Sequence, residues 1–302
     1  MKERDVSKPN RNNGLDPETE FAEIYRNLAT YEFPWDLNQS LSFALFRTYA
    51  VPSVGRLLDQ TGAFTQNTQK RYDDTSILLE VPLLEGFDSP NGKAAIQRIN
   101  QMHHMYDISN EDFLYVLATF VVVPQRWIEN YGWRQLTGDE LLASVRYYQA
   151  LGRHMGIKDI PATYAEFAAL MDTYEAAHFA FDPGARRVAD ATMNLLASFY
   201  PAVAKPIIDI FSRSLMDEPL LAAFRYRNPG NLARRLSAAG LRLRARFVAA
   251  LPPRRTPQYV HTMPRIRSYP NGFDVKTLGT FAPGCPVPHR HSPQPDTTTS
   301  PS

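Results

Sequence analysis

Apolar residues recur at intervals of three and four along most of this 302-residue chain, and no sustained run alternates apolar with polar residues as a strand would. Helix-start signals precede several apolar stretches, among them two capping boxes that begin at Thr137 and Thr163. We therefore expect an all-α protein. The expected helices span residues 16–28, 41–49, 52–61, 68–80, 90–106, 110–131, 137–155, 163–181, 183–200, 201–216, a short stretch from 218, and an arginine-rich helix that ends near 250.

We expect these helices to form one large domain over residues 16–282. Residues 1–15 are polar and residues 283–302 are rich in proline, serine and threonine, so both ends are expected to be disordered. The N-terminus lacks an apolar signal segment, and the longest apolar run, residues 113–124, is shorter than the ~20 residues of a membrane span. These features predict a soluble, cytoplasmic protein.

One histidine shares the apolar face of the expected helix 90–106. Ile99, Met102, His103 and Tyr106 lie at i, i+3, i+4 and i+7, whereas His104 points away from this face. A buried neutral imidazole must use its nitrogens in a hydrogen bond or on a metal, because leaving them unpaired costs roughly 1–3 kcal/mol. The pattern alone leaves two interpretations open for His103, a hydrogen-bonded core residue and a metal ligand.

The expected helix 68–80 carries a second polar group. Arg71, Asp74, Thr75 and Leu78 share one face of this helix, so a guanidinium, a carboxylate and a hydroxyl border an apolar stripe. This arrangement is typical of a pocket wall, although an ordinary ion pair on a helix surface has the same spacing.

The composition limits the kinds of metal site that the chain can build. Cys285 is the only cysteine, which excludes an internal disulfide framework and any multi-cysteine zinc or iron–sulfur site. Glu175 and His178 have the spacing of a di-iron helical bundle, but no second Glu-x-x-His motif occurs. A metal would therefore have to bind through histidine, carboxylate or a cofactor.

Positive charge is concentrated near the C-terminus. Residues 225–267 contain eleven arginines, and no acidic residue or lysine occurs between 219 and 273. The net charge is only +2, so we expect this segment to lie on an acidic surface of the domain, with peripheral contact to an anionic membrane as the alternative. The helix has an apolar stripe, formed by Leu232, Leu236, Ala239, Leu243 and Phe247, and no interleaved aromatic residues that would favour nucleic-acid binding.

Several short blocks follow one another in a fixed order. They are Arg71-x-x-Asp74-Thr75, Arg98-x-Asn100-x-x-His103-x-x-Tyr106, Ile108-Ser109-Asn110-x-Asp112-x-Leu114-Tyr115, Tyr131-Gly132-Trp133-Arg134, Gly152-x-x-Met155-x-Ile157 and Tyr269-Pro270-Asn271-Gly272-Phe273. Over about residues 20–280 this series resembles the MpaB / latex-clearing-protein superfamily of haem b oxygenases. The similarity is greater to the fungal MpaB branch than to the rubber oxygenases.

The resemblance implies a fold, a cofactor and a set of site residues. The implied fold is a single helical domain with a globin-like core and additional helices, and the implied reaction uses haem b and dioxygen on a C=C bond of an apolar substrate such as an isoprenoid. His103 matches the histidine that binds the haem iron, and Arg98 in the same block is expected to bind the cofactor. Arg71 and Thr75 match the distal arginine and threonine of the rubber oxygenases.

Asp74 departs from the pattern, because the rubber oxygenases have a lysine between their distal arginine and threonine. We expect Asp74 to act in proton transfer if burial adjusts its acidity. Two other function classes stay open at this point: a haem-binding sensor or carrier without oxygenase turnover, and a haem-free helical protein that binds lipids or an anionic surface.

Overall fold

The computed structural model describes residues 10–279, and this part of the chain contains thirteen α-helices and no strand. The helices are α1 (Phe21–Asn27), α2 (Pro34–Tyr49), α3 (Pro52–Gln60), α4 (Ala63–Gln66), α5 (Thr68–Glu85), α6 (Pro90–His103), α7 (Asn110–Tyr131), α8 (Gly138–His154), α9 (Tyr164–His178), α10 (Pro183–Ser198), α11 (Lys205–Ser214), α12 (Glu218–Ala223) and α13 (Asn231–Ala250). The all-α class expected from the sequence is confirmed. None of the helices within residues 10–279 combines the length and apolar character needed to cross a bilayer.

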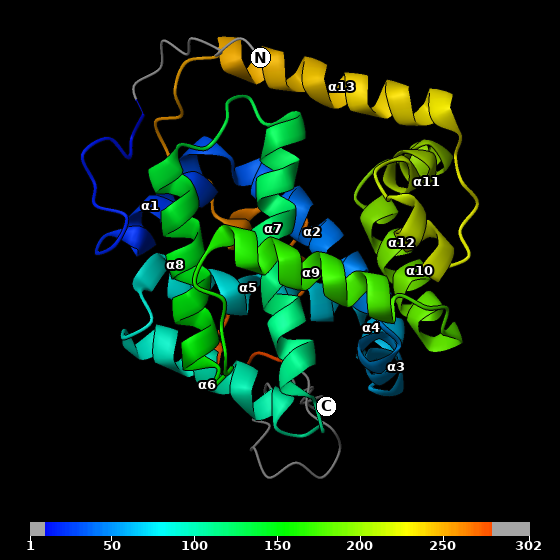
Figure 1. The fold of residues 1–302 in the computed structure, drawn as a ribbon, viewed down its shortest axis with the longest axis horizontal. Helices are drawn as coiled ribbons and strands as arrows, with labels where there is room; N and C mark the ends of the chain where they lie inside the picture. The colour runs from blue at the N-terminus through cyan, green and yellow to red at the C-terminus, as the bar shows by residue number, and fades with distance from the viewer. Residues whose placement is uncertain (1–9, 280–302) are drawn as a thin grey trace, which may run out of the picture.

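The core is built around α7, the longest helix, with 22 residues. It runs through the middle of the molecule and packs against α2, α8 and α9 (Figure 1). Because it is covered on several sides, its apolar run buries residues such as Leu117, Val121 and Val122 rather than a single stripe. Ser89 and Ser109 cap α6 and α7 as the sequence predicts.

Several helix boundaries differ from the expected ones. The chain forms a turn after Asp16, whose carboxylate accepts hydrogen bonds from the Glu18 amide and the Thr19 hydroxyl, and α1 begins only at Phe21. The second helix begins at Pro34 instead of residue 41, because proline is well suited to the first helical position. Helix α6 ends at His103, three residues before the expected end at residue 106, so Tyr106 is not part of it.

Residues 10–15, which we expected to be disordered, pack against the domain. The Asn12 side chain is buried, donates to the Glu140 carboxylate at 2.9 Å and accepts from the Asn27 amide at 3.0 Å. The ordered structure therefore begins before residue 16. The expectations for residues 1–9 and 283–302 lie outside the described residues.

The C-terminal segment, defined here as residues 258–279, lies across α5 and α6. Asp73 on α5 accepts hydrogen bonds from the backbone amides of Arg267 and Ser268, and Glu80 accepts from the amide of His261 at 2.9 Å. Gly279, at the end of this segment, has a φ of +94°, and a side chain there would collide with Met102. The segment therefore fixes both α5 and the end of α6.

Candidate functional site

The end of α6 brings His103 into the interior beside α5. A glycine turn and the Ser89 cap reverse the chain between α5 and α6, so that the two helices pack together. The His103 ring contacts the Phe113 ring edge to face, with 5.2 Å between their centroids. Its Nδ1 atom is buried and has no hydrogen-bond partner among the described residues.

The protonation state of His103 follows from this burial. Burial, together with the nearby groups Arg71 and His104, lowers the pKa of the His103 imidazole to about 4. The ring is therefore neutral at neutral pH, and one nitrogen keeps a lone pair that nothing in residues 10–279 uses. An interior imidazole in this state can bind a metal without first losing a proton.

Arg71 and Thr75 lie one turn apart on α5 and are joined by two hydrogen bonds. The Arg71 Nη1 atom donates to Thr75 Oγ1 at 2.5 Å, and Thr75 Oγ1 donates to the Arg71 carbonyl oxygen at 2.7 Å. The guanidinium also lies over the Phe64 ring, 5.2 Å from its centroid. These contacts orient the Arg71 side chain, and the Thr75 hydroxyl helps to fix the direction of the guanidinium.

No carboxylate of the described residues pairs directly with Arg71, although the charge of Asp74 acts on it. By contrast, the buried Arg134 and the largely buried Arg47 both pair with glutamates. Burial lowers the pKa of Arg71, although a guanidinium stays protonated at neutral pH. A buried unpaired cation is costly, so this site favours an anionic or electron-rich partner.

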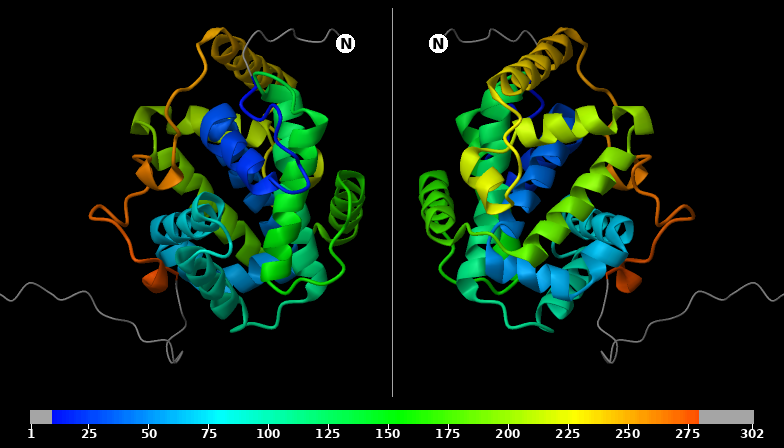
Figure 2. Two further views of the ribbon diagram at one scale, coloured as in Figure 1. Left: turned by 90° about the vertical axis from the view of Figure 1, so that its left-hand side faces the viewer. Right: turned by 90° about the vertical axis from the view of Figure 1, so that its right-hand side faces the viewer.

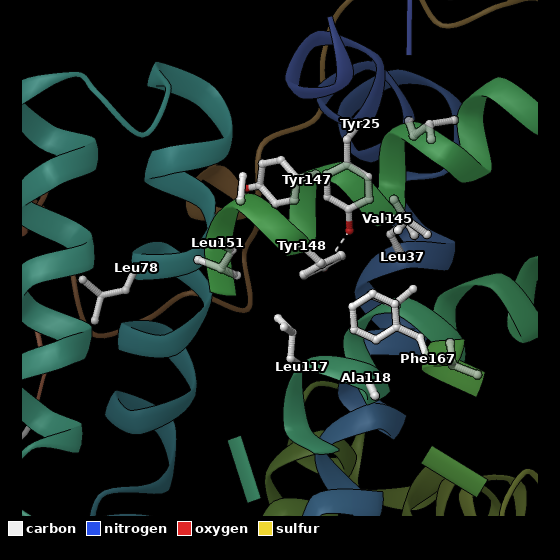
Figure 3. Packing of buried hydrophobic residues seen from close by; sticks show 14 of the residues in the cluster. Tyr25, Leu37, Leu78, Leu117, Ala118, Val145, Tyr147, Tyr148, Leu151 and Phe167 are labelled. Carbon is white, nitrogen blue, oxygen red and sulfur yellow. Dashed lines mark hydrogen bonds between the residues drawn. The ribbon is translucent and has the colours of Figure 1, made fainter. Parts of the chain in front are cut away.

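An apolar cavity of about 130 Å³ lies along the neighbouring face of α5, which shares Thr75 with the face of Arg71. Its wall includes Thr75, Tyr72 and Ser76 from α5, aliphatic side chains from α2 and α10, and aromatic side chains from α1 and α8. Figure 3 shows the aromatic part, where the hydroxyls of Tyr25 and Tyr148 form a hydrogen bond of 2.7 Å. Thr75 is the only expected site residue on the wall, and it connects the cavity to Arg71.

Asp74 faces away from the cavity. Its fully buried carboxylate pairs with Lys70 at 2.6 Å and accepts a hydrogen bond from the Tyr269 hydroxyl of the C-terminal segment. Burial and the Asp74 carboxylate raise the pKa of Tyr269, so its hydroxyl stays protonated. A lysine does reach this position, but it comes from residue 70, one turn before Asp74.

The structure thus brings Arg71, Thr75 and His103 near one another. The other two expected site residues, Asp74 and Arg98, have partners in the C-terminal segment instead. Arg98 is buried on α6 and donates to the Leu278 carbonyl oxygen through Nε at 2.8 Å. Lys70 and Tyr269 were not expected. Tyr269 could have been identified from the sequence, because it is the first residue of the last block that resembles the family.

The di-iron alternative has no support in the geometry. The Glu175 carboxylate pairs with Arg47 and accepts from Tyr115, and the His178 ring stacks on Tyr174 at 4.0 Å between centroids. Across residues 10–279, no group of three or more His, Cys, Asp and Glu side chains is arranged to hold a metal ion.

Comparisons with known proteins point to one family. A family model described as "ER-bound oxygenase mpaB/B'/Rubber oxygenase, catalytic domain" matches residues 38–250. The ER-bound oxygenase mpaB' of Penicillium brevicompactum is 33% identical in an alignment of 224 positions that covers 68% of this chain and 53% of that protein. The ER-bound oxygenase mpaB of the same fungus is 33% identical in an alignment of 225 positions that covers 68% of this chain and 57% of that protein. The matched part of the chain thus spans about half the length of these relatives.

A solved structure shares the fold. Latex clearing protein in its closed state aligns with a TM-score of 0.50 over 83% of this chain and 72% of that chain. The sequence identity is 17%, so this similarity concerns the fold alone.

Proposed function

Because the chain belongs to the mpaB and rubber oxygenase catalytic-domain family, we propose that it is a haem b-dependent oxygenase that oxidises or cleaves a C=C bond of an apolar substrate. Cleavage balances without a reductant, since one dioxygen molecule and one C=C bond give two carbonyl groups. The observation that carries the proposal is the neutral imidazole of His103, whose buried Nδ1 has no described partner and whose pKa is lowered in part by the nearby charge of Arg71.

The residues around His103 fit a haem. His103 would hold the haem iron through a ring nitrogen that no described residue uses. The guanidinium of Arg71, which no described carboxylate pairs with, would offer a cation to an anionic or electron-rich group. The apolar cavity next to it, which is lined by Thr75 and not by His103, suits a hydrocarbon. Haem b, when bound, supplies the iron at which dioxygen is activated.

Arg71 and Thr75 would act together in this site. A fixed guanidinium stabilises negative charge that develops on oxygen, and it does so best when its orientation is set before the reaction. The hydrogen bonds between Arg71 and Thr75 provide that orientation. We therefore propose Arg71 as the electrostatic catalyst and Thr75 as its positioning residue.

Two further roles stay predictions. Asp74 is proposed to take part in proton transfer, with Lys70 and Tyr269 as the groups that share its proton. Arg98 is proposed to support cofactor binding by holding Leu278 against α6, five residues before His103.

The cavity beside Thr75 is the proposed place of the substrate. Its wall is mainly aliphatic and aromatic, which favours an apolar chain such as an isoprenoid over a charged metabolite. The hydroxyl of Tyr72 is buried without a described partner and would orient a polar end of such a molecule.

The test compares three proteins expressed with haem supplied: the wild type, His103→Ala and the matched control His104→Ala. We expect near-stoichiometric haem by pyridine haemochrome in the wild type and the control, and its loss in His103→Ala. Oxygen uptake and carbonyl products are then measured with farnesol and geranylgeraniol as unsaturated probes.

Each result has a distinct consequence. A colourless wild type, or full haem in His103→Ala, would overturn the cofactor assignment. Bound haem without oxygen-dependent product from either probe, or from unsaturated fatty chains, would favour a haem-binding sensor or carrier.

A further inference from the structure

The apolar stripe of α13 points out of the molecule. Its four large members, Leu232, Leu236, Leu243 and Phe247, are between 64% and 72% exposed. They lie at i, i+4, i+11 and i+15, so they form one line along nearly the whole 20-residue helix. An exposed apolar line of this length is unusual for a surface helix and marks a contact surface.

The opposite face of α13 holds the helix in this orientation. Leu241 and Ala245 are buried against the body, and Leu243 is about 200° of helical rotation from Leu241. Arg244 pairs with the buried Asp36 at 2.9 Å and covers the Trp35 ring at 3.8 Å. The apolar stripe is therefore presented by a fixed helix, which lies along the outer edge of the molecule (Figures 1 and 2).

Three arginines border the stripe. Arg235, Arg242 and Arg246 are exposed, and none forms a salt bridge with a described residue. Residues 219–273 contain no acidic residue. The acidic surface that we expected beneath the arginine-rich segment therefore neutralises only part of it, through pairs such as Arg234 with Glu218 and Arg244 with Asp36.

The neighbouring helix also exposes apolar residues. α11 packs against α13, and Ile207 and Ile210 of α11 are 68% and 44% exposed, while Val203 just before it is 88% exposed. Val203 precedes the helix by two residues, and the three lie at i, i+4 and i+7.

From these observations we propose that α13 docks on an anionic lipid bilayer, with its apolar stripe in the acyl boundary and its bordering arginines on lipid phosphates. A helix with this division of faces lies in the plane of a membrane interface. A second copy of the chain is a poorer occupant, because it would bring the same arginines and no acidic residue on α13 to pair with them. This proposal does not depend on the proposed oxygenase activity.

The experiment measures sedimentation of the full chain with vesicles of phosphatidylcholine, with and without phosphatidylserine, at low and high salt. We expect binding to the anionic vesicles that weakens with salt. Arg235→Gln/Arg242→Gln/Arg246→Gln should lower the affinity roughly fivefold for each arginine, or about a hundredfold in all. Leu243→Ser/Phe247→Ser should lower it by about tenfold or more.

A matched control removes the same charge from the far end of the molecule. Lys93→Gln/Arg153→Gln/Lys158→Gln changes three exposed residues around α6 and α8, and we expect its affinity to stay within about twofold of the wild type. All variants are compared by circular dichroism, since the substituted side chains are exposed and should leave the fold intact. Absence of vesicle binding by the wild type, or an equal loss in the control, would overturn the proposal. So would a dimer, seen by light scattering without vesicles, that Leu243→Ser/Phe247→Ser dissociates.

Discussion

The hydroxyl of Tyr269 donates to the carboxylate of Asp74, although the two residues are 195 positions apart. This bond joins the C-terminal segment to α5 within one turn of Arg71. The Asp74 carboxylate, at the position where the rubber oxygenases' pattern has a lysine, thus interacts both with a lysine on the same helix and with a tyrosine from the far end of the domain.

Substitutions can distinguish the role of Asp74 in catalysis from the role of its hydrogen bond with Tyr269 in stability. If Asp74 transfers a proton, Asp74→Asn should lower product formation by about a hundredfold or more. Tyr269→Phe keeps the carboxylate and should cost about 1 kcal/mol of stability with a small effect on turnover. The measurements are steady-state oxygen uptake and urea unfolding. Unchanged turnover in Asp74→Asn would remove Asp74 from the mechanism and leave it as an anchor for the C-terminal segment.

Replacing Arg71 should affect activity and stability in opposite directions. Arg71→Leu removes a buried cation that has no described counter-ion, so the free energy of unfolding should stay equal or rise by about 1 kcal/mol. Turnover should fall by about a hundredfold, because the electrostatic contribution is lost. Arg71→Lys keeps the charge but not the forked donor geometry, and we expect intermediate turnover. A strong loss of stability in Arg71→Leu, measured by denaturant unfolding without haem, would mean that the residue is mainly structural.

A larger side chain in the cavity should reduce substrate turnover without changing the haem content. Ser76 lies on the cavity wall, and Ser76→Phe would occupy much of its volume of about 130 Å³. We expect turnover of long apolar probes to fall by at least about tenfold, with the haem content unchanged. Ser76→Ala is the matched control and should behave like the wild type. Equal turnover in all three proteins would place the substrate elsewhere.

Acid should weaken the contact that anchors the N-terminal residues. Burial alone would raise the pKa of Glu140, but hydrogen bonds and the charge of Arg134 outweigh it and lower the pKa below its usual value of 4.5. The carboxylate's stabilisation is therefore complete above about pH 4.5 and is lost as the pH falls through the lowered value.

The test is Glu140→Gln, which leaves Arg134 buried without its main partner and should cost about 3 kcal/mol at pH 7. The difference from the wild type should narrow below pH 4.5, measured by urea unfolding at several pH values. A difference that stays constant with pH would contradict the assigned role of the Glu140 charge.

Local sequence signals were sufficient for much of the helical structure. The capping boxes at Thr137 and Thr163 and the serine caps of α6 and α7 all begin helices as expected. Such signals involve residues within one turn of each other, so they act in the same way in any tertiary structure. The same holds for Arg71 and Thr75, whose spacing alone places them on one face of α5.

The sequence by itself therefore determined the helical class, most helix starts, and the family resemblance that singled out His103. Only the tertiary structure decided that Asp74 meets Tyr269, that Arg98 holds Leu278, and that the apolar stripe of α13 faces outward. These relationships depend on which helix faces are covered and on contacts between residues almost 200 positions apart. Periodicity identifies an apolar face, but only the packing of the whole chain determines what that face contacts.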